Sequence, residues 1–116
     1  LKLIKFINER GGHAKVSDLS APPKEFGSFK DMFQSLFNHE VKVSKAINDL
    51  VDVSLQEKDY ATHNFLQWFV SEQIEEEALA RNILDKINLI GDDKSGFYLF
   101  DNDMKQLITN PASPEV

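Results

Sequence analysis

The sequence predicts an all-α fold in which two long antiparallel helices form part of a helical bundle. Apolar side chains recur at alternating spacings of three and four residues over residues 28–57 and again over residues 60–90. That period is typical of a helix face that packs against another helix. No stretch shows the strict alternation of a strand. Only Lys58 and Asp59 separate the two helical segments, so we expect a tight turn and an antiparallel hairpin.

Composition narrows the class of protein. The chain has 116 residues, of which 41% are hydrophobic and 28% charged, which suits one folded domain. The absence of cysteine excludes thiolate metal clusters, disulfides and cysteine nucleophiles. The net charge of −6, without a basic stripe, gives no reason to expect nucleic acid or an anionic membrane as a partner. No secretory signal or membrane-spanning run is visible, and we expect a cytoplasmic protein.

Shorter segments flank the hairpin. Residues 1–10 predict a helix that ends at Gly11, a residue common at helix C-termini. Residues 11–27 contain a Pro-Pro pair and no helical period, which predicts a long crossover along the bundle. After the hairpin we expect a turn over residues 91–96, an aromatic patch over residues 97–100 and a short helix over residues 101–108.

Three glutamates interrupt the apolar stripes of the two long helices. Glu40 falls in the middle of the first stripe, and Glu72 and Glu76 fall in the middle of the second. Gln73 shares the face of Glu72 and Glu76, because it lies three residues before Glu76. An uncompensated carboxylate in an apolar bundle is costly, so such a set requires a partner.

Three explanations for these glutamates stay open at this point. They reach water at the edge of the stripe, they pair with basic side chains, or they bind a metal ion. Carboxylates suit iron, manganese, magnesium or calcium, and bundle di-metal sites use inward glutamates with a residue pair at i, i+3, as Gln73 and Glu76 provide. None of the histidines, His13, His39 and His63, forms a Glu-x-x-His pair, and we expect each to be structural.

The apolar surface of the hairpin predicts an assembly. Two amphipathic helices cannot bury both of their stripes in a monomer, so we expect another copy or an upstream part of the chain to cover them. Trp68 lies off the face that carries Phe65 and Phe69, which favours a second interface.

Residues 64–77, with the sequence NFLQWFVSEQIEEE, closely resemble the fourth bundle helix of bacterial non-haem ferritins. Residues 38–50 resemble the third helix, residues 6–12 the end of the second, and residues 21–23 the crossover. The resemblance implies a ferritin-like four-helix bundle, here a single N-terminally incomplete domain over residues 1–116. Its parts would be the end of the second helix, a crossover over residues 11–27, the third helix over residues 28–57, the fourth over residues 60–90, and a short fifth helix and tail over residues 97–116.

The resemblance implies iron storage and detoxification. Such ferritins oxidise Fe(II) to Fe(III) with dioxygen or peroxide at a di-iron carboxylate site inside the bundle, and deposit mineral in a homo-oligomeric 24-subunit shell. Carried over residue by residue, Glu40 matches the metal-binding glutamate of the third helix, and Gln73 and Glu76 match the pair near the same iron. Glu72, Glu75 and Glu76 match the acids of a third iron site. No haem is expected, because the pattern around Gln73 resembles that of the haem-free group.

The resemblance begins part-way along the family pattern. In the family, a first helix with one glutamate and a second helix with a Glu-x-x-His pair precede the position that Leu1 matches. The resemblance therefore implies a ferroxidase for an intact protein and leaves the activity of the 116-residue chain alone open. By itself this chain is expected to bind iron weakly. Two alternatives stay open: a non-catalytic helical assembly module derived from a truncated ferritin, and a bundle stabilised by calcium or magnesium without redox chemistry.

Overall fold

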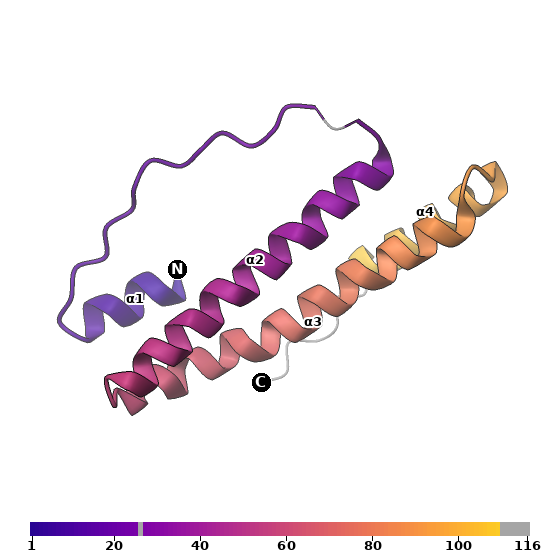
Figure 1. Ribbon diagram of the computed structural model, residues 1–116. Helices are drawn as coiled ribbons and strands as arrows, with labels where there is room; N and C mark the ends of the chain where they lie inside the picture. The colour runs from indigo at the N-terminus through magenta and orange to yellow at the C-terminus, as the bar shows by residue number, and fades with distance from the viewer. Residues whose placement is uncertain (26, 110–116) are drawn as a thin grey trace.

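The structure, a computed structural model, describes residues 1–25 and 27–109, the side chains of residues 107–109 excepted. All regular elements within these residues are helices: α1 (Lys2–Glu9), α2 (Phe29–Gln56), α3 (Tyr60–Ile90) and α4 (Lys94–Thr109). Figure 1 shows α2 and α3 side by side and antiparallel, with α1 near the closed end of the hairpin; the chain reverses after α3, and α4 runs back beside α3. The all-α prediction is confirmed.

Side-chain caps fix where the two long helices begin. The Ser28 hydroxyl accepts a hydrogen bond from the backbone N–H of Asp31 at 3.1 Å, and Asp31 places a negative charge in the first turn of α2. The Asp59 carboxylate accepts bonds from the backbone N–H of Thr62 at 3.1 Å and from its hydroxyl at 2.6 Å. Gly91, with φ +59°, ends α3 in the left-handed region that glycine enters without strain.

Asp59 also joins α1 to the hairpin turn. Arg10, which follows α1, places its Nη2 at 3.1 Å from Asp59 Oδ1. The two hydrogen bonds from Thr62, together with the Arg10 guanidinium, hold the pKa of Asp59 below its usual 3.8. Because the folded pKa is depressed, ionised Asp59 stabilises the fold above pH 3.8, and the stabilisation is lost as the pH falls through the folded pKa.

We therefore expect Asp59→Ala to lower the thermal unfolding temperature near neutral pH. The difference from wild type should shrink as the pH is lowered below 3.8 toward the folded pKa, because the wild-type carboxyl becomes protonated over that range. Thermal unfolding followed by circular dichroism at a series of pH values measures this. Asp52→Ala, at an exposed position of α2, serves as the control. A difference that is independent of pH would show that the charge of Asp59 does not stabilise the turn.

Aromatic contacts hold α1 against the first turns of α3. The rings of Phe6 and Phe65 are stacked with centroids 3.9 Å apart, and the Lys2 ammonium lies 3.4 Å from the ring centroid of Trp68. The segment between α1 and α2 travels along the hairpin in Figure 1, from its closed end to the start of α2.

The last helix differs from expectation. The turn after α3 was expected over residues 91–96 and a helix from residue 101, yet α4 begins at Lys94 and contains the aromatic patch. Asp93 explains the early start, because its side chain accepts from the backbone N–H of Ser95 at 3.0 Å and its carbonyl accepts from Phe97 N–H at 3.1 Å. The expected tail over residues 110–116 lies outside the described residues.

The best-buried cluster lies where α2, α3 and α4 meet, at the open end of the hairpin. Phe100 of α4 is only 4% exposed and makes edge-to-face contacts with Phe33 and Phe29 of α2, at centroid distances of 6.4 and 5.8 Å. The other buried members of this cluster come from α3: Ile83, Leu84 and Ile87. Burial of these side chains holds α4 on the hairpin.

Elsewhere the apolar stripes stay partly uncovered. On α2, Leu36 is 43% and Leu50 49% exposed, and on α3 Leu79 is 44% exposed. Trp68 touches Phe69 edge-on but remains 47% exposed. Within the described residues, the two short flanking helices do not cover these faces of the two long helices, as expected for a hairpin taken alone. What covers them stays a prediction.

Candidate functional site

Glu40 and Gln73 meet across the middle of the hairpin. The Gln73 side-chain Nε2 lies 3.2 Å from Glu40 Oε2, 3.2 Å from the Glu40 carbonyl oxygen and 3.1 Å from Ser44 Oγ. The two Glu40 atoms only accept hydrogen bonds, so the NH₂ group of the amide must face them. All three residues are half-buried between α2 and α3.

The remaining predicted ligands lie on α3 beside this pair. Glu72 is half-buried, whereas Glu75 and Glu76 are exposed. The expectation that Glu40, Glu72, Glu76 and Gln73 gather in one interior patch is therefore met for Glu40 and Gln73 but not for Glu76. In the part of the chain that the structure describes, no three His, Asp or Glu residues are grouped so that they could hold a metal ion. The face of α3 that carries Glu76 is uncovered within the described residues, which leaves its carboxylate in water.

A small cavity flanks Gln73 between the two long helices. Its volume is about 230 Å³, and its polar lining consists of Ser44, Asn48, Gln73 and Glu77. Glu77 is half-buried and lies 3.9 Å from the guanidinium of Arg81. This cavity is large enough for water, so the polar groups between the helices can be solvated from this side.

The histidines lie apart from this arrangement. His13 and His39 are exposed. His63 is half-buried in the first turn of α3, with its Nε2 at 3.3 Å from the amide nitrogen of Gln67. That each is structural stays a prediction.

Ser44 is the residue that sequence reasoning missed. It lies four positions after Glu40, and residues at i and i+4 share a helix face. That spacing could have identified Ser44, but a serine on an apolar stripe is a weaker signal of a functional site than a glutamate. Its hydroxyl gives the amide of Gln73 an acceptor that does not depend on the Glu40 side chain.

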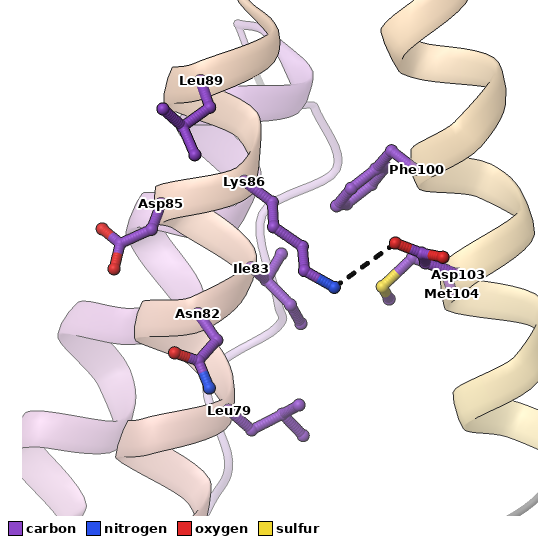
Figure 2. A pocket seen from close by; sticks show the side chains of 9 residues that line it. All are labelled: Leu79, Asn82, Ile83, Asp85, Lys86, Leu89, Phe100, Asp103 and Met104. Carbon is purple, nitrogen blue, oxygen red and sulfur yellow. Dashed lines mark hydrogen bonds and ion pairs between the residues drawn. The ribbon is translucent and has the colours of Figure 1, made fainter.

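A second hollow, about 310 Å³, lies between α3 and α4 and is mostly apolar. Figure 2 shows Ile83 from α3 and Phe100 and Met104 from α4 pointing into it, with the Lys86–Asp103 ion pair across the gap at 3.4 Å. The Lys86 and Asp103 side chains are about half exposed, so the pair contributes little to stability. This hollow offers a metal no cluster of oxygen donors.

The donors around Glu40 suit a hard cation in part. The half-buried carboxylate of Glu40 is an oxygen ligand of the kind that iron accepts, whereas the neighbouring Gln73 amide turns its NH₂ group toward it. The carboxylate supplies only a portion of a coordination sphere, because Glu76 and Glu75 are turned to water in the described chain. The Gln73 amide holds the Glu40 carboxylate in one orientation, and the described residues supply no complete set of ligands for a metal ion.

Comparison with known proteins identifies the family. A family model for the ferritin-like domain matches residues 1–90. The chain belongs to the ferritin family. This ferritin chain is 47% identical over 106 residues to a bacterial non-heme ferritin of Campylobacter jejuni, and 44% identical over 108 residues to a probable bacterial non-heme ferritin-like protein of Haemophilus influenzae. These matches cover 91% and 93% of the ferritin chain, and confirm the resemblance.

A solved structure confirms the fold. The open pore ferritin of the archaeon Archaeoglobus fulgidus aligns with 88% of this ferritin chain at a TM-score of 0.85 and 46% identity. The alignment covers 63% of that chain, and the ferritin chain spans 64% and 66% of the two bacterial relatives' lengths. None of the helices over the described residues combines the length and apolar character needed to span a bilayer.

Proposed function

We propose that the protein to which this chain belongs stores iron, by oxidising Fe(II) at a carboxylate site inside the helical bundle and depositing Fe(III) within a homo-oligomeric shell. The observation that carries the proposal is the interhelical Glu40–Gln73 contact, in a chain that belongs to the ferritin family. Iron is the substrate and cargo of this reaction, and dioxygen or peroxide the oxidant. The 24-subunit shell and a cytoplasmic location are part of the proposal.

Glu40 has the central role in this proposal. Its carboxylate binds Fe(II), and before the ion binds the Gln73 amide fixes the orientation of that carboxylate by donating to Oε2. Bound iron would supply the redox chemistry. The side chain of Gln73 spans from α3 to α2, so it also holds the two helices in the register that the site requires.

Three further acids of α3 act outside this pair. Glu75 and Glu76 lie three and four residues after Glu72, so each neighbours Glu72 on the surface of the helix. Together with the overall charge of −6 they attract cations to the hairpin. We assign Glu76 to the same iron as Glu40 in the assembled bundle, and Glu72 and Glu75, with Glu76, to a third iron position. No haem is part of the proposed centre.

The competing function is a non-catalytic assembly module. The exposed stripe residues Leu36, Leu50 and Leu79 favour it, because apolar faces of this kind drive association whether or not iron is bound. The two functions differ in what happens to Fe(II).

Fe(II) added anaerobically, followed by air, separates the two functions. We expect Fe(III) absorbance to rise faster than in buffer alone, and iron to co-sediment with a large protein assembly that shows mineral cores by electron microscopy. Assembly without faster oxidation would favour the module. Oxidation at the buffer rate with iron precipitating outside the protein would contradict storage.

A further inference from the structure

The Gln73 amide has more acceptors than it has hydrogens. Its NH₂ group carries two hydrogens, and three acceptor atoms lie within 3.2 Å: Glu40 Oε2, the Glu40 carbonyl oxygen and Ser44 Oγ. At least one hydrogen is therefore shared between two acceptors. If one acceptor is withdrawn, the other two still satisfy both hydrogens.

A cation that coordinates Glu40 through Oε2 competes with the Gln73 amide for that oxygen. The lone pairs of Oε2 that accept the amide hydrogen then point at the cation. The NH₂ group carries a partial positive charge, so the cation repels it. The backbone carbonyl of Glu40 and the Ser44 hydroxyl remain in place. Both lie on α2, so the amide keeps two partners without leaving its helix–helix position.

We propose that Ser44 is a positioning residue for cation binding: it accepts the Gln73 amide when a cation takes Glu40 Oε2. The inference rests on the proposed function, because the cation is Fe(II). Ser44 touches neither iron nor oxidant in this proposal and acts only through Gln73. Because the Ser44 hydroxyl accepts the amide, no buried N–H group is left without a partner when Oε2 is released. The free-energy cost of releasing Oε2 therefore stays small.

Ser44→Ala tests this inference. In this variant, cation binding leaves the two amide hydrogens with only one protein acceptor. We expect the anaerobic affinity for Fe(II), measured by isothermal titration calorimetry, to fall about two- to tenfold, the range that one net hydrogen bond contributes. Water in the adjacent cavity of about 230 Å³ can replace part of the lost bond, which places the effect toward the lower end. The unfolding temperature of the iron-free protein should stay unchanged, because Oε2 and the carbonyl then serve both hydrogens.

Two variants provide the controls. Ser44→Thr keeps a hydroxyl at the same position and should restore wild-type affinity. Ser35→Ala makes the same chemical change at an exposed position of α2 and should leave affinity unchanged. Equal affinities for Ser44→Ala and Ser35→Ala would overturn the inference. So would a lowered unfolding temperature of iron-free Ser44→Ala with no rescue of affinity by threonine, because Ser44 would then be a packing residue.

Glu40→Ala, measured in the same titration, separates this inference from the proposed function. If Fe(II) affinity is independent of Glu40, the proposed iron site is wrong and the role of Ser44 falls with it. If Glu40→Ala weakens binding while Ser44→Ala does not, the iron site stands and only the role of Ser44 is overturned.

Discussion

Replacing Glu40 with alanine is expected to slow Fe(II) oxidation by the assembled protein more than any other single change on the hairpin. Removing a side chain that only orients a metal ligand typically costs about 10–100-fold in affinity or activity, and loss of the ligand itself should cost at least as much. Stopped-flow measurement of Fe(III) absorbance gives the rate. Glu57→Ala, an exposed glutamate just past the end of α2, is the matched control and should oxidise iron like the wild type.

The same variant should fold as well as the wild type in the absence of iron. The Gln73 amide keeps the carbonyl of residue 40 and the Ser44 hydroxyl as acceptors, and a half-buried carboxylate is removed. Thermal unfolding of the iron-free proteins should therefore show an equal or higher transition temperature. A clear loss of stability, with oxidation unchanged, would show that Glu40 is a structural partner of Gln73 and not an iron ligand.

Phe100→Ala is expected to have the largest effect on stability. The side chain is 4% exposed and packs against Phe29 and Phe33, so its removal leaves a cavity where three helices meet. Truncation of a buried phenylalanine costs about 3–5 kcal/mol. Because Phe100 is the one buried residue of the short α4 among the described side chains, the loss should detach α4 before the hairpin opens. Hydrogen exchange followed by mass spectrometry should show faster exchange over residues 94–106 than over α3.

Tyr98→Ala supplies the comparison for this prediction. Tyr98 lies on the same helix but is 68% exposed, so truncating its ring removes little buried contact within the chain. We expect exchange in α4 to stay near the wild-type rate in that variant. If both variants release α4 equally, the helix is held by contacts with other copies and not by the cluster around Phe100.

The sequence by itself determined the helices and the central contact of the site. Periodicity placed the two long helices close to their observed bounds, and the caps at Ser28 and Asp59 are local, since each side chain bonds a backbone group three residues on. Periodicity also placed Glu40 on the first stripe and Gln73 on the face of Glu72 and Glu76, and of the expected meetings the structure shows that of Glu40 with Gln73.

Only the tertiary structure decided which members of each stripe are buried. Helical period states which residues share a face, but burial requires a neighbour, and Leu36, Leu79 and Glu76 stay exposed where the described chain provides none. The burial of Phe100 likewise depends on tertiary packing: α4 begins at a local cap on Asp93, but Phe100 is buried only because α2 and α3 lie against it. The role of Ser44 also depends on tertiary structure, because its hydroxyl can accept the Gln73 amide only when that amide, from another helix, lies 3.1 Å away.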